Sequence, residues 1–426
     1  MNANNIEKIA IFYSKLYSSS LSVRALLALV IFCACPLLSQ ASSMKEFISY
    51  VSRTNPAILS AQSEVAKADA NYAQSRRPIY NPSLDVDAER VNQESFEDTY
   101  TAGINQTVDL FNKRGANAAV GQHGLAEAKA NLLAEQLNVT TQALKALAKY
   151  RTAQSVVNLA KQRTQLLAEF KKQNIRKFKS GDIAQDALDQ ASLAYAQAIS
   201  QQADEEIILM NAYQNLIAIT QTSPNTWPIM PDKLPIPLHI SIAKQEEWLR
   251  KLPVIEIYDA KVATAKAIIR VAQAETKPDP TIGFRGGTED NELLIGGSLS
   301  IPLFVRNNFD GQVHVANHQA IAVEQEQMNI YRQNKARLQG DLSKYNILYN
   351  AAGQWSQASK HSLDGGIDLL NRLWSAGELS TTDYLVQLKQ RIDSQISGVE
   401  LTGKSWQMWF SVMEASGQLK TWIEKT

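Results

Sequence analysis

Residues 176–183 read RKFKSGDI, and residues 372–379 read RLWSAGEL. In both stretches an Arg is followed, at the same spacing, by an aromatic residue, a small residue, Gly, an acid and an aliphatic residue. The second stretch comes nearly half a chain after the first, which indicates an internal duplication. Because Gly permits a tight turn between two helices, each motif is predicted to form the tip of a long helical hairpin.

Further pairs of matching residues occur in the same order in the two halves. They are Asn55-Pro56 with Leu252-Pro253, Asn81-Pro82 with Asp279-Pro280, and Leu110-Phe111 with Leu303-Phe304. These matches predict a first structural repeat over residues 42–221 and a second over residues 254–426. Residues 222–253 lie between the repeats and are rich in proline. Since proline disrupts a helix interior, this stretch is predicted to be an extended connector.

Each repeat has the same predicted order of elements. A short helix, over residues 57–75 and again over 255–276, precedes a proline, two alternating segments, a long helix, the Gly tip and a returning helix. Residues 125–180 contain neither Gly nor Pro, and a helix of that length would extend about 80 Å. Its apolar stripe should coil against other helices and includes Leu133, Leu137, Leu144 and Leu147. Glycines in the second long helix predict bends or short breaks, at Gly340, Gly353, Gly365 and Gly366.

Segments that alternate between apolar and polar residues precede each long helix. From Tyr100 to Leu110 the even positions are mostly apolar and the odd positions polar, and residues 84–89 alternate likewise. The second repeat has similar segments within residues 282–301. Segments of about 10 residues match tilted membrane strands, although a soluble sheet with one buried face would give the same pattern. Four strands cannot close a barrel around a channel, but several chains contributing four strands each could.

The first 41 residues have the pattern of a cleaved export signal. An apolar run over residues 25–38 is followed by Ser39-Gln40-Ala41, which supplies the small residues that signal peptidase requires. The basic residues before the run are Lys8, Lys15 and Arg24. The run is shorter than the roughly 20 residues of a membrane helix, so any membrane span is predicted to consist of strands. Lipid attachment at Cys35 is an alternative fate for this segment.

Composition and motifs argue against several functional classes. The formal net charge of the 426-residue chain is +1, and a nucleic-acid partner would call for a basic surface. Both cysteines, Cys33 and Cys35, lie in the predicted signal, so no disulfide or Cys metal site is expected after cleavage. His314 and His318 have the spacing of metal ligands on a helix, but no third ligand is evident. No nucleophile, phosphate-loop or paired-carboxylate motif is present, so we expect neither an enzyme nor a cofactor.

The duplicated order of helix, two strands, long helix, Gly tip and returning helix resembles the TolC-like outer membrane efflux family. The resemblance spans essentially the whole chain after residue 41. Residues 81–86 (NPSLDV), 103–106 (GINQ) and 110–115 (LFNKRG) look most like its heavy-metal cation (CzcC-like) branch. The resemblance implies a mainly α fold with membrane β. Three protomers would supply four strands each to one 12-stranded β-barrel, and their helices would form a coiled-coil periplasmic tunnel.

The resemblance also implies partners. A member would be a homotrimer in the outer membrane of a Gram-negative bacterium, in contact with lipid. It would work with a periplasmic adaptor (membrane fusion) protein and an inner-membrane RND-type pump. The family meets its adaptor at the two tips, which makes the candidate contact residues Arg176, Gly181, Asp182, Arg372, Gly377 and Glu378.

A pore-constricting residue follows from the same resemblance. The family has an Asp six residues after the tip Gly, in a ring that narrows the pore, and Gly377 and Asp383 match this spacing. Ala187 occupies the corresponding place in the first repeat, so only one such ring is expected. An ordinary solvated helix residue is the alternative for Asp383.

The polar faces of the first two predicted strands carry acidic residues. These residues would make a barrel lumen favourable to cations, and they are Asp85, Asp87, Glu89 and Asp109. The resemblance implies a passive exit duct of a tripartite efflux system, and its heavy-metal branch implies heavy-metal cations as the cargo. A duct of the same fold for drugs or type I secretion is one alternative. A periplasmic coiled-coil adaptor is another, although an adaptor would carry one hairpin flanked by small β domains.

Overall fold

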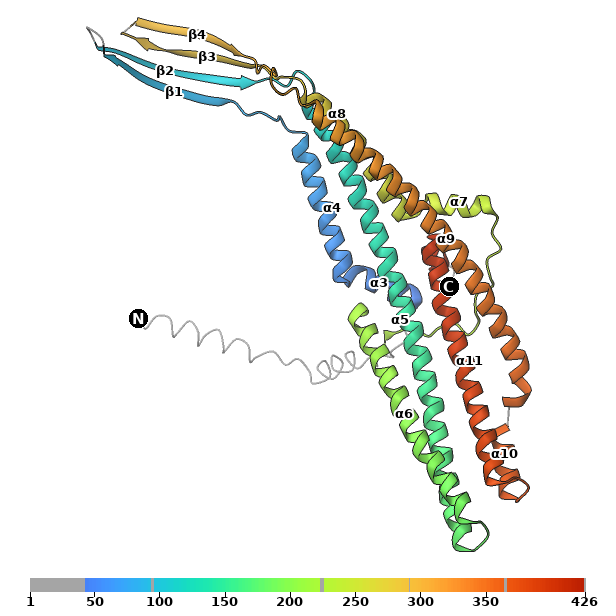
Figure 1. Cartoon of the computed structure of the whole chain (residues 1–426). Coiled ribbons are helices and arrows are strands. Elements are labelled where there is room, and N and C mark those ends of the chain that lie inside the picture. Colours follow the sequence, from blue (N-terminus) through green and yellow to red (C-terminus); the bar gives the residue numbers. More distant parts are fainter. Residues whose placement is uncertain (1–42, 93–95, 223–225, 291, 364–365, 425–426) are drawn as a thin grey trace, which may run out of the picture. The chain divides into compact units, whose positions relative to one another are not determined.

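The computed structural model of the chain describes residues 43–92, 96–222, 226–290, 292–363 and 366–424. The predicted export signal over residues 1–41, and with it Cys35, lies outside the described residues. Residues Ser42–Thr426 form one unit by their internal contacts. The described part of this unit is mainly helical and carries one small sheet (Figure 1).

The first repeat begins with two helices whose first turns are capped. Helix α3 (Met44–Thr54) follows Ser43, whose hydroxyl accepts the Glu46 N–H while the Glu46 carboxylate accepts the Ser43 N–H. Helix α4 starts at Pro56, a position where a helix needs no amide donor. The repeat comprises α3, α4 (Pro56–Ser75), β1 (Ser83–Asn92), β2 (Phe96–Thr107), α5 (Lys113–Lys179) and α6 (Gln185–Thr220).

The same order of elements recurs in the second repeat. It comprises α7 (Ile242–Arg250), α8 (Pro253–Glu275), β3 (Thr281–Glu289), β4 (Glu292–Ser300), α9 (Asp310–Leu363), α10 (Gly366–Ser375) and α11 (Thr381–Ser416). The short helix α12 (Leu419–Ile423) follows α11. Helix α8 again starts with a proline, and α9 with α10 takes the place of α5. The predicted order of elements therefore occurs twice.

Three expectations about these elements were wrong in detail. Helix α5 starts at Lys113, well before the stretch without Gly, and its 67 residues extend about 100 Å. Helix α9 continues unbroken through Gly340 and Gly353, where interruptions were predicted, but it ends at Leu363 and α10 starts at Gly366, so the break predicted at Gly366 does occur. An interior Gly costs only about 1 kcal/mol, which packing against neighbouring helices outweighs. The proline-rich stretch is not wholly extended, because α7 lies within it.

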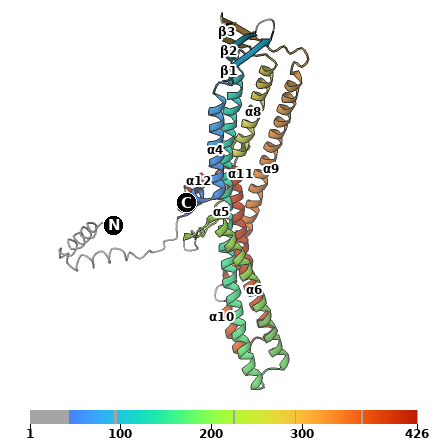
Figure 2. The ribbon, with the colours of Figure 1, turned by 90° about the vertical axis from the view of Figure 1, so that its left-hand side faces the viewer.

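The four strands form one antiparallel sheet in the order β1-β2-β3-β4. Its two hairpins come from different repeats and are joined by β2 and β3, which pair from Thr99 opposite Glu289 to Thr107 opposite Thr281. The sheet lies at one end of the long helices, and the α5–α6 and α10–α11 turns lie at the opposite end (Figures 1 and 2). The unit therefore has a strand end, formed by the sheet, and a tip end, formed by the α5–α6 and α10–α11 turns.

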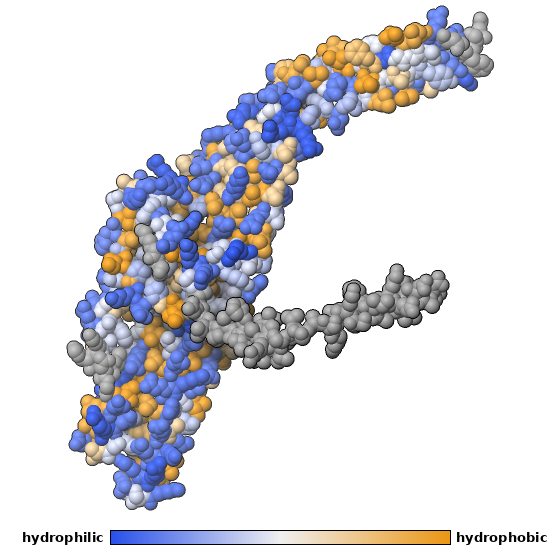
Figure 3. Space-filling view, turned by 180° about the vertical axis from the view of Figure 1, so that it is seen from behind, coloured by the Kyte–Doolittle hydropathy of each residue, from blue (hydrophilic) through white to orange (hydrophobic). Residues whose placement is uncertain are grey.

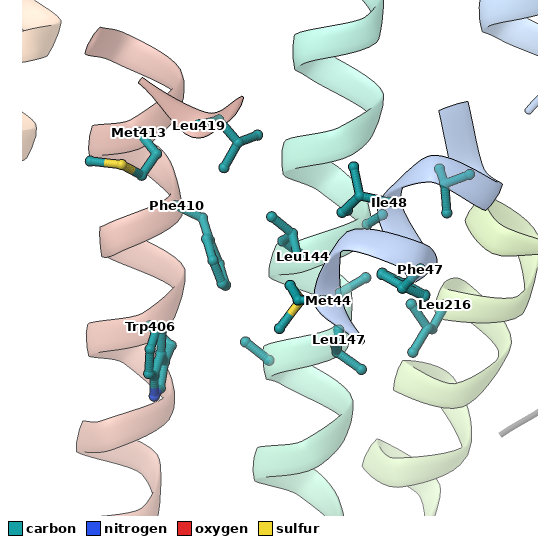
Figure 4. Close-up of a cluster of buried hydrophobic side chains, with 14 of the residues drawn as sticks. Met44, Phe47, Ile48, Leu144, Leu147, Leu216, Trp406, Phe410, Met413 and Leu419 are labelled. Atoms are coloured by element: carbon teal, nitrogen blue, oxygen red, sulfur yellow. The ribbon is translucent and has the colours of Figure 1, made fainter. Parts of the chain in front are cut away.

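The largest buried cluster joins side chains of α3, α5, α6, α11 and α12 (Figure 4). Leu144 and Leu147 lie at its centre and are fully buried, as the predicted stripe requires, whereas Leu133 is half exposed. Trp227 of the connector is also buried here, with its ring centroid 4.9 Å from that of Tyr150. Arg151 Nη2 donates to the Trp227 and Pro228 carbonyls, which holds the connector against α5.

Candidate functional site

The sheet has one strongly apolar face that is exposed. Leu84, Ile104 and Phe284 lie opposite one another on β1, β2 and β3, so they share this face. Phe284 is 74% exposed, and Ile295 of β4, on the same face, is 80% exposed. Orange residues gather over the strand region in the space-filling view (Figure 3). Because large apolar patches are uncommon on soluble monomers, this face calls for a partner or a lipid environment.

The opposite face of the sheet is polar. Asp85 lies opposite Gly103, which lies opposite Arg285, so these residues share that face. Asp87 and Glu89 follow Asp85 at alternate positions of β1 and point the same way, away from the apolar residues. All three acids are exposed. The structure therefore brings three of the four predicted lumen residues onto one face.

The glycines on the two faces of the sheet differ in how much space surrounds them. A Cβ added at Gly103, on the polar face, would lie only 3.1 Å from Arg285 Cβ, and one at Gly283 would overlap Asn105 and Ser298. On the apolar face, the atoms nearest to an added Cβ at Gly286 and Gly297 are 3.7 and 3.8 Å away. The polar face is therefore more closely packed around its glycines than the apolar face.

Asp109, the fourth predicted lumen residue, lies outside the strands. Strand β2 ends at Thr107, and the Asp109 carboxylate accepts the backbone N–H groups of Lys113 and Arg114 at 2.8 Å each. It satisfies unpaired donors in the first turn of α5 and places a negative charge at the positive end of the helix. Its observed contacts are therefore those of a helix-capping residue.

A buried ion pair joins the sheet to the helices, and sequence reasoning missed it. Lys113 Nζ lies 2.9 Å from Asp279 Oδ2, and their side chains are only 6% and 3% exposed. The Tyr80 hydroxyl donates to the same oxygen at 2.7 Å, and Glu275 lies 3.6 Å from Lys113 Nζ. These four residues flank β1, β3, α5 and α8. Lys113 and Asp279 stand in motifs recognisable in the sequence, but their pairing across the two repeats is not.

The charges and hydrogen bonds at this junction shift the pKa values of Asp279 and Tyr80. Burial raises the pKa of Asp279, but hydrogen bonds from Lys113 and Tyr80 and the charge of Lys113 lower it by more, so the net pKa lies below 3.8. The hydrogen bond to Asp279, reinforced by burial, raises the pKa of Tyr80 to about 12. The Asp279 carboxyl is consequently ionised at neutral pH.

The two predicted tips have the same backbone geometry. Gly181 and Gly377 have φ of +83° and +80°, a left-handed conformation that favours glycine. At the first tip the Gly181 N–H donates to the Phe178 carbonyl and the Asp182 N–H to the Lys177 carbonyl. The second tip repeats both bonds with Gly377 and Glu378 as donors, so α5 and α10 each end in a Schellman motif.

The side chains of the candidate tip residues point into solvent. All six predicted contact residues are exposed, namely Arg176, Gly181, Asp182, Arg372, Gly377 and Glu378. Arg176 and Arg372 lie in the last turns of α5 and α10, and the other four lie on the two turns that follow, at the same end of the described unit (Figure 2). The tips are therefore accessible to solvent at one end of the described unit.

The aromatic residues of the two tip motifs differ in burial. Phe178 is 39% exposed, whereas Trp374, at the same place in the second motif, is 4% exposed. The Trp374 ring packs against Phe170 of α5, with centroids 4.6 Å apart, and Lys177 Nζ lies 4.3 Å from the Trp374 ring centroid. Tyr384 stacks on Phe170 at 4.2 Å. The second hairpin is thereby fastened to the first near the tips.

Asp383 lies in the first turn of α11 and is exposed. Ser380 caps this helix: its hydroxyl accepts the Asp383 N–H at 3.0 Å and donates to Asp383 Oδ2 at 2.6 Å. These contacts orient the carboxylate at a helix start, where its charge is favourable. They suit a stabilising helix residue, and in this single chain the carboxylate also stays open to solvent.

The described residues contain no group of three or more His, Cys, Asp and Glu that could hold a metal ion. His314 and His318 are both exposed on α9. Within the described part of the chain we also find no helix whose length and apolarity would let it cross a membrane.

The edges of the sheet are open. In the part of the chain that the structure describes, β1 pairs only with β2 and β4 only with β3. Such edges present unpaired N–H and C=O groups that can accept a further strand. In this sheet the open edges flank the exposed apolar face.

Comparison with solved structures identifies proteins of the same fold. The chain superposes on the Campylobacter jejuni CmeC outer membrane channel with a TM-score of 0.73 and 16% identity, covering 88% of this chain and 85% of that one. For the channel CusC the TM-score is 0.74 at 14% identity, with 88% and 92% covered. For the open state of the Neisseria gonorrhoeae MtrE outer membrane channel it is 0.69 at 16% identity, with 88% of each chain covered.

These likenesses confirm the predicted fold at the level of one chain, mainly helical with a small four-stranded antiparallel sheet. No protein-family model and no curated protein matches the sequence.

Proposed function

We propose that this chain is the outer-membrane exit duct of a tripartite efflux system, a passive channel in the outer membrane of a Gram-negative bacterium. The observation that carries the proposal is the four-stranded sheet with an exposed apolar face, a polar face opposite to it and two open edges. A fold shared with outer membrane channels supports it.

The proposed assembly is a homotrimer. Four strands cannot enclose a channel, but three copies joined edge to edge give twelve strands, with the apolar faces toward lipid and the polar faces toward the lumen. The long helices would then surround a periplasmic tunnel. Asp85, Asp87 and Glu89 would line the lumen from β1, while Asp109 would stabilise α5 at the base of the barrel.

The proposed partners at the tip end are a periplasmic adaptor protein and, through it, an inner-membrane RND-type pump. Two exposed turns of identical backbone geometry would offer the adaptor two similar surfaces per chain, centred on Arg176 and Gly181 and on Arg372 and Gly377. The pump supplies energy and selects cargo, so this chain would need no cofactor and would catalyse no reaction.

Asp383 is the proposed pore-constricting residue. Three copies would form a ring of carboxylates at the tip end, which favours cations and opposes anions. The Ser380 hydroxyl would orient each carboxylate. Replacing Asp383 with Ala is expected to reduce cation selectivity in single-channel recordings, and unchanged selectivity would leave it with only its helix-capping role.

For the cargo we propose heavy-metal cations, which suit the acidic residues on the polar face. Export of drugs or type I secretion through the same fold is the main alternative. Deleting the gene should then lower tolerance to metals such as zinc, cobalt or copper. New drug sensitivity with unchanged metal tolerance would favour the alternative. The hypothesis of a periplasmic adaptor loses support. An adaptor would carry one helical hairpin, whereas this chain has two helical hairpins and a four-stranded sheet.

The proposal is tested first on the purified chain. The protein is extracted from outer membranes in mild detergent, its mass is determined, and it is inserted into a planar bilayer. We expect a trimer that forms a cation-preferring pore. A monomer in the periplasmic fraction, or a trimer without conductance, would refute the duct.

A further inference from the structure

The polar face of the sheet carries acids along the β1 edge and an arginine one strand in from the β4 edge. At the β1 edge stand the acids Asp85, Asp87 and Glu89. Near the β4 edge stands Arg285 of β3, on the same face. Its guanidinium forms no ion pair or hydrogen bond with any described residue. A lone cation close to an open edge is a feature that the isolated sheet leaves unexplained.

The side chain of Arg285 extends toward the open edge. It lies alongside Gly296 of β4, where an added Cβ would be 3.3 Å from Arg285 Nε and 3.5 Å from Arg285 Cγ. Because Gly296 has no side chain, the arginine can pass over β4 and away from β2. The Arg285 side chain therefore reaches over the edge strand of this chain at Gly296.

We propose that Arg285 forms an ion pair with a β1 carboxylate of a second copy of this chain, which closes the barrel between protomers. This inference rests on the proposed trimeric duct. Adjacent strands lie about 4.8 Å apart, so the next copy's β1 would lie about 10 Å from β3. An extended arginine and an acidic side chain together span that gap.

The partner on β1 is Asp87 or Glu89 rather than Asp85. The Asp85 carboxylate already accepts a hydrogen bond from Asn105 of its own chain, whereas Asp87 and Glu89 make no ion pair or hydrogen bond with any described residue. The stagger of the strands also favours Asp87 or Glu89 over Asp85 as the partner. Pairing of β1 stops at Ser83 opposite Asn105, while β2, β3 and β4 continue to Thr107, Thr281 and Ser300. Continuing this stagger around a barrel brings Gly296 opposite the later residues of β1.

The contact would determine which edges meet. The β4 edge of one copy would bind the β1 edge of the next, a head-to-tail contact that closes into a ring. Two β1 edges would bring like charges together, which disfavours that pairing. Glu289 and Glu292 add negative charge near the β3–β4 turn, beyond the stretch that Arg285 reaches. The ion pair would thus select which strand edges pair between copies, and it would also stabilise the trimer.

The experiment uses the full chain, purified as a trimer from outer membranes, with Arg285→Glu, Asp87→Arg and Glu89→Arg made singly. Each swap, Arg285→Glu with Asp87→Arg and Arg285→Glu with Glu89→Arg, is also made. The dissociated fraction in detergent is measured over a temperature series. Arg285→Glu is expected to raise that fraction about tenfold at a fixed temperature, since the change acts three times per trimer. One of the two swaps should restore the trimer toward wild type.

Lys233→Glu is the matched control, because it makes the same charge change at an exposed connector residue. It should leave the dissociated fraction unchanged. Circular dichroism of each variant verifies that the helices form. If Arg285→Glu dissociates like wild type, or if neither swap restores the trimer, the ion pair does not exist, although the duct could still stand. If the wild-type chain itself is not a trimer, the proposed duct fails first.

Discussion

At the scale of single residues, the Lys113–Asp279 ion pair is the interaction most sensitive to substitution. Both side chains are almost fully buried at the junction of sheet and helices. Replacing Lys113 with Met would leave the Asp279 charge buried without its partner, at a cost of about 3–5 kcal/mol in the free energy of unfolding. Denaturant unfolding of the purified chain measures this. The double variant Lys113→Met/Asp279→Leu should be more stable than the single one, and an equal loss in both would contradict the pair.

Asp279 at the same junction should make the free energy of unfolding depend on pH. Because the folded-state pKa of Asp279 is lowered below 3.8, its contribution to stability is complete above about pH 4. That contribution is lost as the pH falls through the lowered pKa. The unfolding free energy of wild type should therefore fall more steeply with acidification below about pH 4 than that of Lys113→Met/Asp279→Leu. Parallel curves for the two proteins would show that Asp279 does not titrate differently on folding.

At the scale of elements, the two helical hairpins are joined by aromatic residues of the second tip. Trp374 is buried against Phe170 and Lys177, while Phe178 holds the same place in the first motif and is exposed. Truncating Trp374 to Ala should cost about 3–5 kcal/mol, because it removes a large buried side chain and leaves a cavity. Phe178→Ala should cost less than about 1 kcal/mol. Thermal unfolding of both variants tests the asymmetry, and equal losses would contradict it.

At the scale of the whole molecule, the two faces of the sheet should respond oppositely to charge. Ile295 lies on the apolar face and Ser298 on the polar face of the same strand. A lysine at Ile295 would face lipid in the proposed barrel, at a cost of about 2–4 kcal/mol near the bilayer centre. The amount of Ile295→Lys recovered from outer membranes should fall, whereas Ser298→Lys should assemble normally. Similar recovery of both variants would argue that the apolar face does not meet lipid.

The sequence alone determined the features that repeat or alternate along the chain. The two tip motifs, the helical stretches and the strand faces are local patterns with a fixed period, so they could be read without knowing what packs against them. Helix α9 is a case in which a local pattern did not predict the structure. Its internal glycines suggested breaks, but packing outweighed a cost of about 1 kcal/mol for each.

Tertiary structure decided which distant residues meet. It paired Lys113 with Asp279, buried Trp374 while leaving its counterpart Phe178 exposed, and turned Arg285 across Gly296. It also placed Asp109 before α5, where the carboxylate accepts backbone N–H groups of the first turn, and not in a strand. Each of these contacts joins separate elements, and their relative position depends on the packing of the whole unit. No period along the sequence encodes such a position, which is the physical reason that only the folded chain reveals it.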